Sequence, residues 1–303
     1  MPARIVFMGS PEFALPSLRT LAAAHEVVGV VTQPDQPAGR GKQLTPPSVK
    51  TLALELGLPI MQPERLRGPE AIAQLHSWAP DVIVVTAFGQ ILRKDVLALP
   101  PYGCINVHAS LLPRWRGASP IQAAILHGDR EAGATIMRMD AGLDTGPILS
   151  QRAILIEPAD TAGTLSEKLA TLGADLLHDT LPGYLLGELN PIAQSEEGVT
   201  TTGLLTKAEG LLEPNQIAEV LARKVRAFNP WPGAYIKWKN QPIKIHRAHV
   251  SSGNSDPGKF SVKHGLPALG TAFGLLLLDE VQPAGKRAMS GKEFLQGARN
   301  WEQ

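Results

Sequence analysis

Residues 105–120 read INVHASLLPRWRGASP, an apolar strand pattern that carries polar side chains at alternate positions. Successive side chains of a strand point to opposite faces, so Asn106, His108 and Ser110 share one face. A Leu-Leu-Pro sequence at 111–113 ends the strand, which places the polar row at its carboxyl end. Ligands of open α/β sheets bind at that end, so the row is a candidate site.

Four further apolar runs surround this one: ARIVFM (3–8), EVVGVVTQ (26–33), DVIVVTAF (81–88) and ATIMRMD (134–140). Helical patterns lie between and after them, near residues 14–24, 47–56, 69–78, 120–127 and 160–186, the last broken near Pro182. Buried strands that alternate with helices are typical of a parallel, doubly wound sheet. We therefore predict an α/β domain with a Rossmann-like sheet.

A different pattern follows in the last third of the chain. A short amphipathic helix at 214–227 precedes three runs with turns between them, AYIKW, QPIKIHRAHVS and GTAFGLLLLDEV. Short strands of this kind fit a small antiparallel β-barrel, which we expect to be OB-like. The predicted organisation is a catalytic domain at 1–188, a linker with little apolar periodicity at 189–206, and a β-barrel domain at 207–303.

Composition indicates a globular protein, because 44% of the 303 residues are hydrophobic and 19% are charged. The one cysteine, Cys104, excludes an internal disulfide and suits a reducing compartment. The first residues, MPARIVFMGSPEF, resemble neither a secretion signal nor a membrane span. We expect a cytoplasmic protein with no membrane partner and, by default, a monomer.

Charge is distributed unevenly along the chain. Residues 1–206 hold 15 Lys and Arg against 20 Asp and Glu, whereas residues 207–303 hold 14 against 8. A basic module joined to a mildly acidic one suggests a polyanionic partner such as a nucleic acid. The alternative is a solvated basic face that meets no partner.

Several familiar sites are excluded by their spacing. The loop after the first apolar run, GSPEF at 9–13, lacks the glycine pattern that receives a dinucleotide. The glycines around Arg40 and Lys42 lack the remaining positions of a phosphate-binding Walker loop. His246 and His249 have no accompanying cysteine pair, so we expect no metal site.

An acid is needed to complement the polar row, and Asp144 in the glycine-rich loop MDAGLDTGPIL is the favoured candidate over Asp140. One reading makes Ser110 a nucleophile in a hydrolase triad with His108 and Asp144, although no Gly-x-Ser-x-Gly sequence surrounds it. In the other, an amine attacks an activated acyl or formyl group directly. The imidazole and the amide of Asn106 then stabilise the oxyanion, and the carboxylate orients the imidazole or accepts a proton.

The motifs INVHASLLPRWRGASPIQAAILHGD and GATIMRMDAGLDTG resemble the signature of folate-dependent formyltransferases. The stretches FMGSPEFALPSL, TQPDQPAGRGKQLTPPSVK, RAFNPWPGAY and LDEVQPAGKRAMSGKEFLQG extend the resemblance over nearly the whole chain. With its basic second domain, the chain is most similar to the members that act on methionylated initiator tRNA. Members that act on glycinamide ribonucleotide lack that domain.

The resemblance implies transfer of a formyl group from 10-formyltetrahydrofolate to the α-amine of methionyl initiator tRNA, with Asn106, His108 and Asp144 as the catalytic residues. The implied folate-binding residues are Ser110, Leu111, Leu112 and Pro113, with Phe88, Gly89 and Gln90. The implied tRNA-binding residues are Arg40 and Lys42 in the insertion at 34–47, and Arg223, Lys224, Lys237 and Lys239. Two alternatives stay open, a formyltransferase for an amino sugar nucleotide and a noncatalytic RNA-binding module.

Overall fold

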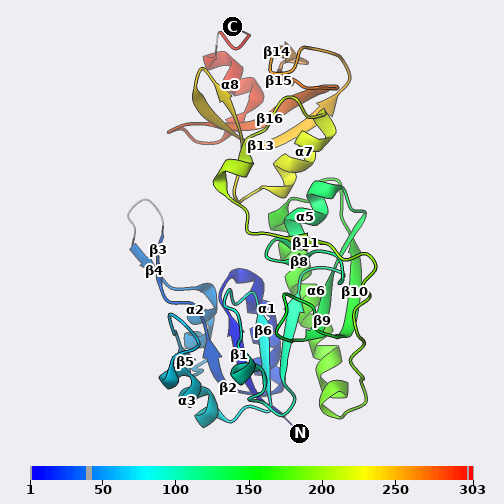
Figure 1. The fold of residues 1–303 in the computed structure, drawn as a ribbon. Coiled ribbons are helices and arrows are strands. Elements are labelled where there is room, and N and C mark those ends of the chain that lie inside the picture. Colours follow the sequence, from blue (N-terminus) through cyan, green and yellow to red (C-terminus); the bar gives the residue numbers. More distant parts are fainter. Residues whose placement is uncertain (1, 39–42, 299, 303) are drawn as a thin grey trace. The chain divides into compact units, whose positions relative to one another are not determined.

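The computed structural model describes residues 2–38, 43–298 and 300–302, and the chain forms two compact units (Figure 1). The first unit comprises Met1–Gly117, Ala132–Ile154 and Ser166–Thr201, and the second comprises Ala118–Glu131, Leu155–Leu165 and Thr202–Gln303. The segment expected as a linker, 189–206, is thus divided between the units after Thr201.

Up to Thr202, strands and helices alternate much as the sequence predicts. The elements are β1 (Arg4–Gly9), α1 (Leu15–Ala24), β2 (Glu26–Val31), β3 (Gln36–Ala38), β4 (Gln43–Thr45), α2 (Ser48–Glu55), β5 (Ile60–Met61), α3 (Pro69–Trp78), β6 (Val82–Thr86), α4 (Lys94–Leu97), β7 (Cys104–His108), β8 (Arg116–Gly117), α5 (Pro120–His127), β9 (Glu131–Arg138), β10 (Ile148–Leu155), α6 (Ala162–Leu185) and β11 (Thr201–Thr202). Proline opens α3 and α5, where its missing N–H costs no hydrogen bond. The predicted break at Pro182 is wrong, because this residue lies inside α6, near its end.

The sheet of the first unit has seven strands in the order β10-β9-β7-β6-β1-β2-β5. Strands β5, β2, β1, β6 and β7 run parallel, as predicted for β1, β2, β6 and β7, whereas no strand was predicted at β5. The prediction is wrong for β9, which pairs antiparallel with β7 and sets Thr135 opposite His108 and Arg138 opposite Ile105. The connecting helix α5 belongs to the second unit, so it is not the crossover that a parallel return needs.

Helices cover both faces of this sheet. Side chains of β1 alternate, so that Ile5 and Phe7 pack with residues of α1, α2 and α6, and Val6 and Met8 pack with residues of α3 and α4. Both sets are fully buried, as expected for central parallel strands. The sheet therefore forms a rigid support for loops at its edge.

The insertion after β2 forms a small antiparallel hairpin, β3–β4, which extends beyond the helices of the first unit (Figure 1). Its base is fixed by Asp35, whose two carboxylate oxygens each accept a hydrogen bond from Lys50 Nζ at 2.8 Å. Gln62 Nε2 donates to Asp35 Oδ1 and to the carbonyl of Gln33, both at 2.8 Å. The hydrogen bonds from Gln62 and Lys50 hold the pKa of Asp35 below its usual value.

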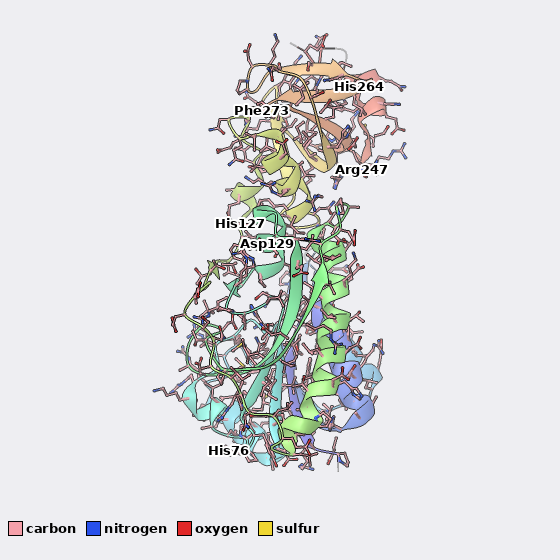
Figure 2. All side chains as sticks on the ribbon, turned by 90° about the vertical axis from the view of Figure 1, so that its right-hand side faces the viewer. His76, His127, Asp129, Arg247, His264 and Phe273 are labelled. Carbon is pink, nitrogen blue, oxygen red and sulfur yellow. The ribbon has the colours of Figure 1, made fainter. Side chains whose placement is uncertain are left out.

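The second unit is built on an antiparallel, curled sheet in the order β12-β13-β16-β15-β14, with β17 beside β16. From Lys207 on, the elements are a short 3-10 helix (Lys207–Gly210), α7 (Ala218–Ala227), β12 (Ala234–Trp238), β13 (Gln241–Ser251), β14 (Phe260–Lys263), β15 (Leu266–Gly270), β16 (Leu275–Pro283), β17 (Met289–Ser290) and α8 (Gly291–Gly297). Its core includes Trp301, whose ring centroid lies 4.5 Å from that of Phe260 and 5.3 Å from that of Phe294. Arg247, His264 and Phe273 are exposed on this unit (Figure 2).

Candidate active site

The polar row at the end of β7 is buried. Asn106 and His108 lie within the strand, and Ser110 follows it in the turn that leads to the Leu-Leu-Pro sequence at 111–113. Strands β6 and β7 are parallel, so the residues after β6, Phe88 to Gln90, leave the sheet at the same edge. The structure therefore brings two of the predicted groups to one edge of the sheet, as expected for ligand binding.

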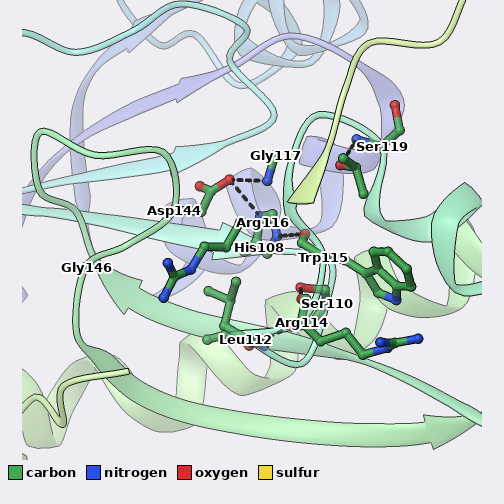
Figure 3. Close-up of polar contacts among 12 residues, drawn as sticks. His108, Ser110, Leu112, Arg114, Trp115, Arg116, Gly117, Ser119, Asp144 and Gly146 are labelled. Carbon is green, nitrogen blue, oxygen red and sulfur yellow. Dashed lines mark hydrogen bonds and ion pairs between the residues drawn. The ribbon is translucent and has the colours of Figure 1, made fainter. Parts of the chain in front are cut away.

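His108 is fixed by a backbone carbonyl. Its Nε2 lies 3.0 Å from the carbonyl oxygen of Trp115 (Figure 3). A carbonyl oxygen only accepts, so Nε2 carries the proton of this hydrogen bond. Nδ1 then faces Asp144, with 3.8 Å between it and Oδ2, which is too long for a direct hydrogen bond.

Asp144 is held in place by its own backbone and by one amide. Its φ of 52° is in the left-handed region, which Asp adopts more easily than most residues. The N–H of Gly117 donates to Asp144 Oδ2 at 2.8 Å. The rival candidate, Asp140, accepts hydrogen bonds from the N–H of Gly142 and the hydroxyl of Thr145 at 2.9 and 2.7 Å. Asp140 therefore caps the loop that carries Asp144.

That loop, residues 139–147, has to double back. Because β9 runs antiparallel to β7, the loop starts beside the amino end of β7, where the N–H of Met139 donates to the carbonyl of Cys104 at 2.8 Å. Asp144 nevertheless lies near His108, at the carboxyl end of β7. The position of the Asp144 carboxylate thus depends on the shape of a loop as well as on the sheet.

The hydroxyl of Ser110 is engaged elsewhere. It donates to the carbonyl of Arg114 at 2.6 Å, while the two nitrogens of His108 face Trp115 and Asp144. This arrangement does not match a Ser-His-Asp triad, in which the imidazole accepts the serine proton. The site has the elements of direct transfer, an amide, an imidazole and a carboxylate around a buried strand end.

Two residues that the sequence did not single out support the turn after β7. Thr135 Oγ1 donates to the carbonyl of Ser110 at 2.6 Å and accepts from the N–H of Leu112 at 3.2 Å. Gln151 Nε2 donates to the carbonyl of Leu112 and to Thr135 Oγ1, at 2.8 and 2.9 Å. Thr135 lies on β9 and Gln151 on β10. They reach this turn because β9 pairs antiparallel with β7, and the hydrophobic periodicity of the sequence did not reveal that pairing.

A cavity of about 290 Å³ lies beside Gln90, after β6. Three arginines line it, Arg65, Arg67 and Arg93, together with Leu66, Gln90, Ile91 and Val96. Gln90 shapes its wall by accepting from the N–H of Leu66 at 2.9 Å and donating to the carbonyl of Pro63 at 3.1 Å. Phe88 is buried in the core, and Gly89 has a φ of 81°. The arginines are functional candidates that the sequence analysis missed, although the RLR sequence at 65–67 was a visible signal.

Comparison with known proteins identifies the family. The family described as "Formyl transferase" matches residues 3–181, and "Formyl transferase, C-terminal domain" matches residues 204–299. The methionyl-tRNA formyltransferase of Myxococcus xanthus is 50% identical over 297 residues, which are 97% of this chain and 95% of that protein. This chain belongs to the formyl transferase family. The resemblance found in the motifs is confirmed, and the chain is a formyl-transferring enzyme of a family whose co-substrate is formyl-tetrahydrofolate.

Two solved structures of low sequence identity share the fold. The sugar 3N-formyl transferase WlaRD, solved in the presence of dTDP and 5-N-formyl-THF, gives a TM-score of 0.68 at 17% identity and covers 95% of this chain and 100% of its own. HypX from Aquifex aeolicus, solved with tetrahydrofolic acid, gives 0.66 at 16% identity and covers 97% of this chain and 47% of its own. At these identities the likeness concerns the fold alone.

The predicted tRNA-binding residues of this formyl transferase occupy different environments. Arg40 and Lys42 lie outside the described residues. Lys237 and Lys239 are exposed, whereas Arg223 Nε donates to the carbonyl of Leu126 at 3.1 Å and Lys224 Nζ to that of Leu211 at 2.8 Å. Partial burial lowers the pKa of Lys224.

Two negative findings concern the part of the chain that the structure describes, residues 2–38, 43–298 and 300–302. No group of three or more His, Cys, Asp and Glu side chains there could hold a metal ion. None of the helices there is long and apolar enough to cross a membrane.

Proposed function

We propose that this formyl transferase moves the formyl group of 10-formyltetrahydrofolate to the α-amine of methionine on initiator tRNA, in the cytoplasm, for translation initiation. The observation that carries the proposal is the buried cluster of Asn106 and His108 with Asp144 3.8 Å from the imidazole, in a chain half identical to a methionyl-tRNA formyltransferase. The cluster suits direct attack by an amine.

In the proposed reaction, the lone pair of the neutral α-amine attacks the formyl carbon and a C–N bond forms. The carbonyl oxygen gains negative charge, which the side-chain amide of Asn106 and a protonated Nδ1 of His108 stabilise. The carboxylate of Asp144 accepts a proton from the attacking amine. The bond from the formyl carbon to N10 of the folate then breaks, N10 takes up a proton, and tetrahydrofolate leaves.

The hydrogen bond from His108 Nε2 to Trp115 supports this assignment, because it fixes the ring with Nδ1 toward the reacting groups. Since Asp144 is beyond hydrogen-bond distance of Nδ1, its carboxylate has room to interact with the amine. Positioning and oxyanion stabilisation then supply the catalysis, with no covalent intermediate.

For the co-substrate, we propose that Ser110 to Pro113 and the backbone around Phe88 to Gln90 hold the folate ring system at the edge shared by β6 and β7. The cavity lined by Arg65, Arg67 and Arg93 supplies positive charge for the carboxylates at the glutamate end of a folate. Guanidinium groups pair well with carboxylates in both charge and shape, so the cavity and the ligand are compatible.

For the tRNA, we propose that the curled sheet of the second unit acts as an OB-like barrel that binds the phosphate backbone. The exposed Lys237 and Lys239 support this, since phosphate contacts by lysine need no base code. Arg40 and Lys42, which lie outside the described residues, and Arg223 and Lys224 on α7 remain predicted contacts. We also propose that the protein is a monomer, which is the default expectation from the sequence. The proposed site is formed by residues of one chain.

The test is formyl transfer by the purified protein from 10-formyltetrahydrofolate to methionylated initiator tRNA, beside a dTDP-linked amino sugar as competing acceptor. We expect formyl-methionyl-tRNA and no formylated sugar, with His108→Ala as the inactive control. Formylation of the sugar alone would replace the proposed acceptor. Binding of tRNA with no transfer, and with unchanged behaviour of His108→Ala, would favour a noncatalytic RNA-binding module.

A further inference from the structure

A segment that follows α6, residues 192–200, crosses the loops of the active site, and we call it the strap. At one end the backbone of Ile192 exchanges two hydrogen bonds with Ile148 of β10, at 2.7 and 2.8 Å. At the other end Thr200 Oγ1 accepts from the N–H of Trp115 at 2.8 Å, and the carbonyl of Thr200 accepts from the N–H of Arg116 at 2.9 Å. All of these residues belong to the first unit.

Gln194, in the middle of the strap, binds the loop that carries Asp144. Its Nε2 donates to the carbonyl of Asp144 at 2.7 Å and to the carbonyl of Gly146 at 2.8 Å. Its Oε1 accepts from Nε of the buried Arg116 at 3.0 Å. The two N–H groups and the oxygen of one side-chain amide are thus all used, and two of the three bonds go to the loop.

The loop needs such support because of its course. It starts beside the amino end of β7 and must return to His108, and Asp144 holds a left-handed backbone within it. At Gly146 a Cβ would collide with the carbonyl oxygen of Arg138, so the loop packs closely on the end of β9. The hydrogen bond from Gln194 to the backbone carbonyl of Asp144 therefore restrains the residue that carries the proposed catalytic carboxylate.

We propose that Gln194 is a positioning residue, which holds loop 139–147 so that the carboxylate of Asp144 faces Nδ1 of His108. The inference rests on the proposed function for the role of that carboxylate. The strap couples both partners, since Thr200 binds the N–H of Trp115, whose carbonyl fixes His108, and Gln194 binds the backbone of Asp144.

The first measurement compares Gln194→Met, which keeps the length of the side chain and loses its hydrogen bonds, with Gln74→Met on the exposed face of α3 as the matched control. We expect kcat for formyl transfer to fall about 10- to 100-fold in Gln194→Met, because small displacements of reacting groups have effects of this size. KM for either substrate stays within about twofold of wild type. Gln74→Met behaves as wild type.

A double-mutant cycle with Asp144→Asn separates positioning from a general effect on stability. If Gln194 acts through Asp144, Gln194→Met lowers the residual rate of Asp144→Asn by less than about twofold. The inference would be overturned if the losses in rate of Gln194→Met and Asp144→Asn were fully additive in the double variant. It would also be overturned if Gln194→Met raised KM and left kcat unchanged.

Hydrogen exchange tests, without any substrate, whether Gln194 holds loop 139–147. We expect faster exchange of amides in residues 140–147 of Gln194→Met, and unchanged exchange in β1 and β6, relative to wild type and Gln74→Met. If the amides of this loop exchange at the same rate in Gln194→Met and in wild type, Gln194 does not hold the loop. If wild type formylates no methionyl-tRNA, the proposed function fails, and the exchange result still decides whether Gln194 holds the loop.

Discussion

The N–H of Gly117 donates to the carboxylate of Asp144 across 27 residues of chain, at 2.8 Å. This bond ties the segment after β7 to the loop after β9, and it occupies the same oxygen that lies 3.8 Å from His108. In the proposed reaction, we therefore expect the other carboxylate oxygen of Asp144 to accept the proton of the attacking amine.

Asp144→Asn is expected to reduce kcat for formyl transfer by about 10³-fold or more, as is typical when the acid of a catalytic imidazole becomes an amide. Its fold should survive, because Asn still accepts the N–H of Gly117 and tolerates a left-handed φ. Asp140→Asn is the matched control, since the amide oxygen of Asn can still accept the hydrogen bonds from the N–H of Gly142 and the hydroxyl of Thr145. Steady-state kinetics that showed equal losses in both variants would refute the choice of Asp144.

Gly146→Ala is expected to destabilise the protein by about 1–3 kcal/mol, the usual range for overpacking. The added Cβ meets the carbonyl oxygen of Arg138, which is backbone and cannot move aside. Gly203→Ala, with no atom near its Cβ position, is the control. Urea unfolding of the three proteins checks this, and an unchanged midpoint for Gly146→Ala would show that the loop is not packed as described.

Asp35→Asn is expected to destabilise the protein at neutral pH and to have little effect in acid. The pKa of Asp35 is lowered in the folded protein, so its contribution is present above the ordinary aspartate pKa of about 3.9 and is lost as the pH falls through the lowered value. Unfolding of both proteins between neutral pH and acid measures this. The control is Glu55→Gln, which removes the carboxylate of an exposed ion pair with Arg19 3.9 Å long and should leave stability at neutral pH nearly unchanged.

Cys104 is expected to resist alkylation in the folded protein. Burial raises the pKa of its thiol to about 12, and only the thiolate reacts. Iodoacetamide at mildly alkaline pH should therefore label the urea-unfolded chain and leave the native chain unlabelled, as mass spectrometry would show. Rapid labelling of the native protein would mean that β7 opens locally.

The sequence predicted the parallel strands β1, β2, β6 and β7, the longer helices and the residues of the polar row, because hydrophobic periodicity and motif spacing are properties of short segments. The short elements β5, α4 and α8 were missed. It could not predict the direction of β9, since a strand pattern is the same in both directions. Nor could it predict the hydrogen bonds of Trp115 to His108 and of Gly117 to Asp144, which are made by backbone atoms of Trp115 and Gly117. Gln194 was missed because its partners lie about 50 residues away, in a segment without apolar periodicity.

The strap also changes what a minimal catalytic fragment must contain. A chain cut after residue 188 would retain Asn106, His108, Asp144 and all strands of the first sheet, yet it would lack Gln194 and Thr200. Weak activity in such a fragment would then reflect a loosened candidate site, and it would be misread as the effect of removing the second unit, which we propose binds tRNA. A fragment that reports on chemistry alone has to extend through Thr201, where the first unit ends.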